Sequence, residues 1–183
     1  MRDAEAVTVR LSDYKPPSYT VDEIALVFTL APNDTVVAAS SAVRRLAPEP
    51  CPLVLNGARL RLENVAIDGR QLSPEDYSLD DHKLVIHKPP AAFRLDIMTR
   101  IDPASNTQLE GLYMSGGRFC TQCEAEGFRA ITFALYRPDV LARYAVRIEA
   151  DKAAYPTLLA NGNLADVLLF GAFLAWAVLS FRA

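Results

Sequence analysis

The chain has 183 residues, of which 51% are hydrophobic, and a formal net charge of −3. This length favours one domain with a sizeable core, and the slightly acidic balance excludes the basic surface that nucleic-acid binding requires. The three cysteines fit a reducing cytoplasm better than a disulfide scaffold, and the charged N-terminus lacks the apolar run of a secretory signal peptide.

Alternating apolar residues predict a first β-strand, where Ile24, Leu26, Phe28 and Leu30 recur with a period of two. Further runs are β-branched or alternating and are separated by turn-forming residues: 35–43, 60–67, 83–87, 93–101, 130–136 and 144–150. A single helical turn is expected at 137–143, because its second residue is a proline. Many short strands at close spacing predict an all-β fold, an antiparallel β-sandwich or curved sheet.

Functional groups are most concentrated between residues 109 and 143. Gly111, Gly116 and Gly117 permit positive φ angles and close backbone approach. The same stretch offers two thiols, an amide and two carboxylates: Cys120, Gln122, Cys123, Glu124 and Glu126. A loop of this kind can hold a carboxylate against a ligand.

With its flanks, this loop closely resembles the N-terminal domain of the aminopeptidase N (alanyl aminopeptidase) family of zinc exopeptidases, in its bacterial form. The resemblance extends, in the order of the family, to Tyr14-Lys-Pro-Pro-Ser-Tyr19, to Leu53-Val-Leu-Asn-Gly57 and to the runs 101–113 and 151–162. It covers residues 14–163 and implies a β domain over residues 1–163. Residues 164–183 lie outside the family pattern.

The resemblance implies a substrate-binding role for two residues of the loop. An exopeptidase must recognise the free α-ammonium group of its substrate, and a fixed carboxylate offers it a short, charge-assisted hydrogen bond. In the family this role falls partly on the glutamate after the second cysteine, here Glu124, and Gln122 matches a glutamine that lines the first substrate pocket. An extended backbone would send both side chains to the same side. Without the resemblance, both would be interpreted as solvated loop residues.

Other residues of the loop are expected to have supporting roles. Glu126, Arg129 and Arg137 are predicted to form an ion-pair set that positions the loop, although a set of ordinary surface pairs is an alternative. No catalytic role is assigned to them.

The cysteines and histidines of the chain raise the question of metal-binding or redox roles. For Cys120 and Cys123 we favour structural or pocket-lining thiols; the alternatives are half of a zinc site, which needs four ligands, and a redox pair, which would sit in a βαβ context. His82 and His87 fail the spacing of an H-E-x-x-H zinc motif and are expected at the surface or at a strand edge.

The zinc site of the family is absent from this sequence. In the family, two histidines and a glutamate hold the zinc and a second glutamate acts as general base. We therefore predict a fragment of a zinc-dependent aminopeptidase, a metallopeptidase and hydrolase that releases N-terminal amino acids from peptides. The fragment would be inactive alone, would contain no cofactor, and would meet a peptide N-terminus only together with a catalytic domain. The alternative is a non-catalytic β-sandwich module that binds peptides or proteins and is tethered to a membrane by its tail.

The tail at 164–183 is almost uninterrupted apolar sequence, with Asp166 as the only charged residue before Arg182. We favour loss of the family pattern by a frameshift or truncation after residue 163. A membrane anchor at 164–181 is a second alternative, although it is short for the roughly 20 residues that a spanning helix needs. A packed helix is the third. The fold expectation thus includes a short, apolar, helix-like C-terminal tail.

Overall fold

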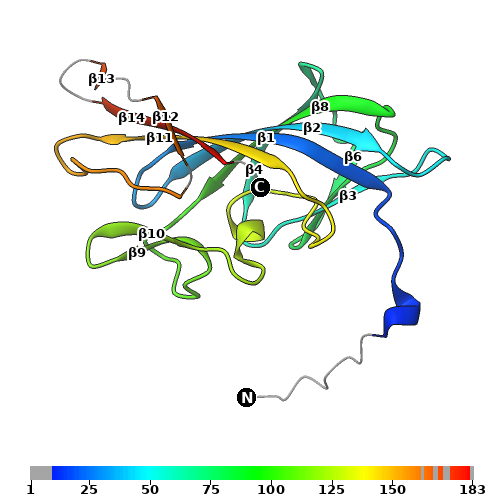
Figure 1. The fold of residues 1–183 in the computed structure, drawn as a ribbon, viewed down its shortest axis with the longest axis horizontal. Helices are drawn as coiled ribbons and strands as arrows, with labels where there is room; N and C mark the ends of the chain where they lie inside the picture. Colours follow the sequence, from blue (N-terminus) through cyan, green and yellow to red (C-terminus); the bar gives the residue numbers. More distant parts are fainter. Residues whose placement is uncertain (1–9, 162, 167–168, 171–173, 182–183) are drawn as a thin grey trace.

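The computed structural model describes residues 10–161, 163–166, 169–170 and 174–181, whose regular structure is almost entirely β (Figure 1). The helical segments of this part of the chain are two short 3-10 helices, η1 (Leu11–Asp13) and η2 (Gly127–Ala130). The prediction of an all-β fold is confirmed. Within the described residues, no helix has the length and apolar character that crossing a membrane would require.

The main sheet has the strand order β12-β14-β11-β1-β2-β8-β4-β5, and β13 pairs with β14. Its strands are β1 (Tyr19–Thr29), β2 (Thr35–Arg45), β4 (Arg61–Ile67), β5 (Arg70–Gln71), β8 (Ala92–Ile101), β11 (Arg143–Asp151), β12 (Asn163–Asp166), β13 (Leu169–Phe170) and β14 (Leu174–Phe181). Among these described strands all pairs are antiparallel, as predicted, except for β1 and β11, which run parallel.

The buried face of β1 changes parity at a β-bulge. Tyr19 and Val21 are buried before the bulge, whereas Ile24, Leu26 and Phe28 are buried after it. The register with β2 shifts directly after Val21, so one extra residue returns the following apolar side chains to the core face. The predicted period-two alternation begins after the bulge and is confirmed.

Two smaller sheets lie against the main sheet. One contains β3 (Leu53–Asn56), β7 (Lys83–Ile86) and β6 (Tyr77–Leu79), and the other is the hairpin of β9 (Gly111–Ser115) and β10 (Arg118–Gln122). Gly116 and Gly117 connect β9 to β10 with φ angles of 56° and 75°, as expected for a tight hairpin turn with two positive φ angles. Figure 1 shows this hairpin as a second layer below the main sheet.

The strand predicted at 130–136 is wrong. η2 occupies its first residue, and beyond it only an isolated bridge joins Ala134 to Asn56. Contacts with distant elements hold this segment instead. In one of them, the Thr99 hydroxyl donates a hydrogen bond to the carbonyl oxygen of Ile131 at 3.1 Å. Tertiary contacts therefore override the β propensity of these residues.

The prediction of a helical turn at 137–143 is also wrong, because no helix forms in the described residues between η2 and β11. The segment has a single non-helical turn, in which the Val140 N–H donates to the carbonyl oxygen of Arg137 at 3.2 Å, and the chain then extends into β11. Leu141 is 75% exposed, so a helix here would gain little apolar burial to stabilise it.

The C-terminal segment forms strands, so the helix-like tail expected from the sequence is wrong. β14 pairs antiparallel with β11 from Tyr144↔Phe181 to Asp151↔Leu174. A helix in this place would leave the backbone groups on that edge of β11 without sheet partners. Parts of the predicted tail, 167–168, 171–173 and 182–183, lie outside the described residues.

A polar cluster fixes the N-terminal strap, defined as residues 14–15, to the turn before β11. Arg137 forms a two-point ion pair with Asp139, with Nε–Oδ1 and Nη2–Oδ2 distances of 2.8 and 2.7 Å. Arg137 also donates to the Lys15 carbonyl oxygen at 2.9 Å, and the Tyr14 hydroxyl donates to Asp139 Oδ2 at 3.1 Å. The hydrogen bonds from Arg137 lower the pKa of Asp139 from 3.8 to about 2.

We expect the N-terminal strap to detach in acid. Because the folded-state pKa of Asp139 lies below its ordinary value of 3.8, the stabilisation is fully present above that pH and is lost as the pH falls toward about 2. NMR signals of the Tyr14 ring should therefore change with a midpoint nearer to pH 2 than to 3.8. The variant Asp139→Asn should show no such transition, and an unchanged midpoint in that variant would mean that another group controls the strap.

Candidate functional site

The loop after β10 divides its side chains between two sides. Gln122, which ends β10 and pairs with Gly111, is exposed, as is Glu124. Cys123 and Ala125 instead line a cavity beneath the main sheet. This alternation places Gln122 and Glu124 together on the outer side of the loop. The Glu124 N–H also donates to Gln122 Oε1 at 3.4 Å, which ties the two residues to each other.

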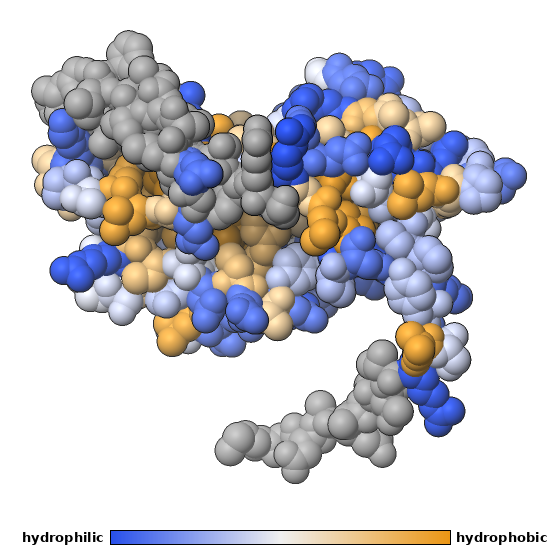
Figure 2. All heavy atoms as spheres, in the orientation of Figure 1, coloured by the Kyte–Doolittle hydropathy of each residue, from blue (hydrophilic) through white to orange (hydrophobic). Residues whose placement is uncertain are grey.

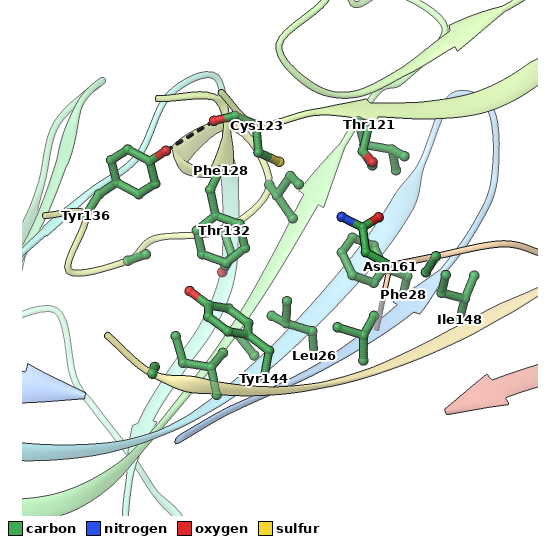
Figure 3. A pocket seen from close by; sticks show the side chains of 18 of the residues that line it. Leu26, Phe28, Thr121, Cys123, Phe128, Thr132, Tyr136, Tyr144, Ile148 and Asn161 are labelled. Carbon is green, nitrogen blue, oxygen red and sulfur yellow. Dashed lines mark hydrogen bonds between the residues drawn. The ribbon is translucent and has the colours of Figure 1, made fainter. Parts of the chain in front are cut away.

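The backbone on both sides of Glu124 is held by one tyrosine. The Tyr136 hydroxyl lies 3.2 Å from the carbonyl oxygen of Cys123, a hydrogen bond that is drawn in Figure 3, and 2.5 Å from the carbonyl oxygen of Ala125. Burial is the main cause that raises the pKa of Tyr136 above 10.0, so the hydroxyl keeps its proton at neutral pH. The peptide bond between Glu124 and Ala125 is cis. The Tyr136 hydroxyl thus restrains the two backbone carbonyl groups on either side of Glu124.

Gly127 closes the base of the loop. Its N–H donates to the Cys123 carbonyl oxygen at 2.9 Å. A Cβ atom at this position would lie 2.3 Å from the Gln122 carbonyl oxygen and 3.0 Å from the Gly111 nitrogen. Only glycine permits such a close approach of two backbone segments, so Gly127 sets the position of the last residue of β10.

The two carboxylates of the loop differ in their partners. Glu126 forms an ion pair with Arg129, with an Oε2–Nη1 distance of 2.7 Å. Glu124 has no ion-pair partner among the described residues. Part of the predicted ion-pair set is therefore correct, but Arg137 pairs with Asp139 instead and contacts the N-terminal strap through the Lys15 carbonyl oxygen. The loop keeps one carboxylate available to a ligand and uses the other internally.

The thiols of the loop do not form a bond to each other. Cys120, Cys123 and Cys51 are all free, and Cys123 is half-buried in the wall of the cavity. Burial raises the pKa of the Cys123 thiol above 9.0, which disfavours the reactive thiolate. The interpretation of Cys123 as a pocket-lining thiol is confirmed.

The two histidines are not among the residues that line the cavity beside this loop. His82 and His87 are both exposed, as predicted, and His87 contacts the Glu75 carbonyl oxygen at 3.1 Å. No group of three or more His, Cys, Asp or Glu side chains placed to hold a metal ion occurs within the described residues. These residues do not supply the donor set that a zinc site needs.

The family described as Peptidase M1 N-terminal domain matches residues 15–171. The chain belongs to this family. The resemblance inferred from the sequence motifs is therefore confirmed, and the chain corresponds to the N-terminal domain of M1 zinc aminopeptidases.

Relatives of this M1 domain are much longer proteins. Aminopeptidase N of Caulobacter vibrioides is 53% identical over 163 residues, which are 89% of this chain and 19% of that protein. Aminopeptidase N of Escherichia coli is 48% identical over 151 residues, or 82% of this chain and 17% of that protein. The M1 chain thus spans about a fifth of the length of the curated relatives it matches.

Solved structures show the same fold. Aminopeptidase A of Legionella pneumophila, in complex with aspartic acid, matches with a TM-score of 0.86 and 28% identity over 94% of this chain and 21% of that chain. An M1 zinc metallopeptidase of Deinococcus radiodurans matches with a TM-score of 0.74 and 16% identity over 91% of this chain and 40% of that chain. The second match shows the fold alone.

Sequence reasoning missed Tyr136 as a residue of the site. It lies in the segment predicted as a strand, and nothing in its local pattern indicates that its hydroxyl contacts carbonyls 11 and 13 positions earlier. Gln122 and Glu124 are brought together as expected, but their roles toward a substrate remain predictions.

We expect the variant Tyr136→Phe to loosen the loop without unfolding the domain. Loss of the hydroxyl removes the donor to the Cys123 and Ala125 carbonyls, and a typical hydrogen bond contributes about 1 kcal/mol. Amide hydrogen exchange at Glu124 and Gly127 should therefore be several-fold faster, roughly fivefold for that energy. Tyr144→Phe is the matched control, because no hydrogen bond to the Tyr144 hydroxyl occurs within the described residues. Equal exchange in both variants would contradict this restraint by Tyr136.

Proposed function

We propose that this M1 domain binds the N-terminus of a peptide substrate for a zinc aminopeptidase. In this proposal Glu124 holds the α-ammonium group and Gln122 lines the first substrate pocket. The observation that carries it is the available carboxylate of Glu124. This side chain is exposed and without an ion pair among the described residues, whereas the neighbouring Glu126 is already paired with Arg129.

The geometry of the loop suits such an anchor. A charge-assisted hydrogen bond from an ammonium group to a carboxylate is short and strong. Its value for catalysis depends on how well the carboxylate is fixed, because the first peptide bond must be held in register for attack. Tyr136 and Gly127 restrain the backbone on both sides of Glu124. A restrained loop loses less conformational entropy when a ligand binds.

The hydrolytic chemistry belongs, in this proposal, to the part of an M1 protein that carries the zinc site. One carboxylate on an open surface does not offset the cost of ordering a peptide, so the domain contributes to binding only when the catalytic part closes the site. In the closed site, both parts of the protein then contact the peptide N-terminus. Three free thiols support a cytoplasmic location for this reaction.

The test joins this chain to the remaining part of Caulobacter vibrioides aminopeptidase N, in place of the matching segment of that protein. We expect chelator-sensitive hydrolysis of a free aminoacyl-arylamide by the joined protein and none by the isolated chain. The same substrate acetylated on its amine should not be hydrolysed, because its positive charge is lost. A joined protein that folds and binds zinc but cleaves the acetylated and free substrates equally well would refute amine recognition by this domain.

A further inference from the structure

A large cavity separates the main sheet from the layer below it. Its volume is about 1440 Å³. Strands β1, β2 and β11 form one wall, and the β9–β10 hairpin, η2 and residues 131–142 form the opposite wall. Residues 154–161 also contribute to the lining. Figure 2 shows apolar side chains exposed along the gap between the two layers. The cavity is thus open to molecules from solution.

The walls of the cavity are mainly apolar. Leu26 and Phe28 on β1 and Ile148 on β11 face it from the sheet, and Phe128 faces it from the opposite layer (Figure 3). Phe28 and Ile148 are direct partners in the parallel register of β1 and β11, so their side chains share one face of the sheet. Such a surface gains free energy when it is covered by another apolar surface.

Several hydroxyl groups interrupt this apolar lining, and those of Thr132 and Tyr144 bear on the choice of ligand. Thr132 is 1% exposed, and its Oγ1 is buried without a hydrogen-bond partner among the described residues. Tyr144 extends into the cavity from β11 (Figure 3), and burial raises its pKa above 10.0, which keeps the hydroxyl protonated. A buried hydroxyl without a partner is unfavourable. A ligand that supplies the missing partner would relieve this cost.

The cavity offers little to a charged ligand. The charged residues of its described lining are Arg118, Glu126 and Arg137, and two of these already have ion-pair partners, Glu126 with Arg129 and Arg137 with Asp139. None of the three is a buried residue. Moving a charged group from water into the apolar interior without a partner is costly.

We propose that this cavity is a binding site for a neutral, mainly apolar molecule that carries one hydroxyl or carbonyl group. Leu26, Phe28 and Ile148 contact its apolar part, and the hydroxyl of Thr132 bonds its polar group. The site is distinct from the proposed amine anchor, because Gln122 and Glu124 lie on the other side of the loop and do not line the cavity. It does not depend on the proposed peptidase function.

The binding test uses the purified full chain and the neutral fluorophore N-phenyl-1-naphthylamine. We expect a saturable rise in fluorescence with one equivalent bound. Decan-1-ol should displace the fluorophore. Decanoate, which is ionised near pH 8, should do so at least about tenfold less effectively, because Arg118, the one charged residue of the described lining without an ion pair, is exposed rather than buried beside the apolar walls. The absence of saturable binding, or equal displacement by the alcohol and the carboxylate, would overturn the proposal.

Three variants locate the site. Ile148→Trp should fill the cavity and weaken fluorophore binding at least about tenfold, whereas Val27→Trp, on β1 but outside the cavity lining, should leave it unchanged. Thr132→Val keeps the side-chain shape and should weaken decan-1-ol binding about fivefold, with fluorophore binding retained. Thermal unfolding shows whether each variant is folded. If Ile148→Trp does not fold, the decan-1-ol affinity of Thr132→Val still tests the assigned site. Unchanged alcohol affinity in Thr132→Val, or loss of binding in a folded Val27→Trp, would overturn the assigned site.

Discussion

Replacing Glu124 by glutamine in the joined M1 protein should lower kcat/KM for a free aminoacyl-arylamide by about 30-fold to 5,000-fold, which corresponds to about 2–5 kcal/mol for truncating one side of a partly buried charge pair. Glutamine keeps the size of the side chain but removes the charge that attracts the ammonium group. The anchor acts in both the ground state and the transition state, so much of the loss should be in KM. A smaller loss in kcat is expected if the scissile bond drifts from its position.

Glu126→Gln in the same joined protein is the matched control. Glu126 lies two positions later in the same loop, but its carboxylate is already paired with Arg129 at 2.7 Å. Exposed pairs of this kind contribute about 0–1 kcal/mol, so kcat/KM should change by no more than a few-fold. Equal losses in both variants, or full activity in Glu124→Gln, would show that this loop does not hold the substrate amine.

Strands with strong alternation could be predicted from the sequence because their pattern is local. The residues from Ile24 to Phe28 alternate in burial as predicted, and the run from Phe93 to Ile101 places its odd positions in the core. The parallel pairing of β1 with β11 could not be predicted, since it joins residues such as Leu26 and Val146 that are far apart in the chain. Periodicity identifies a strand, but it does not identify its neighbour.

The sequence carries a local signal for the β9–β10 hairpin. Gly116 and Gly117 were predicted to allow positive φ angles, and both adopt them. A glycine pair between two short apolar runs is itself a hairpin signal, here between Leu112 and Phe119 on paired strands. The following segment offers no such signal, because Tyr136 contacts carbonyl groups that only the folded loop brings within reach.

Family resemblance, rather than local chemistry, identifies Gln122 and Glu124 as candidate site residues. A glutamine and a glutamate in a polar loop are ordinary surface residues by composition. The structure adds a distinction that the sequence did not contain, because Glu126 is paired with Arg129 and Glu124 is not paired within the described residues. The choice between two nearby carboxylates therefore depends on the tertiary position of one arginine.

Replacing Gly127 by alanine should destabilise the domain strongly and displace the end of β10. The new Cβ would lie 2.3 Å from the carbonyl oxygen of Gln122 and 3.0 Å from the nitrogen of Gly111. Both atoms belong to backbone, so no flexible side chain can move aside. Overpacking typically costs about 1–3 kcal/mol and occasionally more, and we expect the upper end of this range. For a chain of this size, about 3 kcal/mol lowers the midpoint of thermal unfolding by roughly 6–12 °C.

Gly117→Ala separates this steric effect from the loss of glycine itself. Gly117 has a φ angle of 75°, and a Cβ there would meet no atom within 4 Å. Its replacement should therefore cost only the backbone strain of a left-handed residue, about 1–2 kcal/mol, or roughly 2–8 °C. Circular dichroism melts of both variants give the comparison, and NMR of the Gln122 amide reports the displacement of β10. If Gly127→Ala melts at the same temperature as Gly117→Ala and leaves the Gln122 signal unchanged, the loop yields around the new methyl group, and the backbone at Gln122 is not clamped by Gly127.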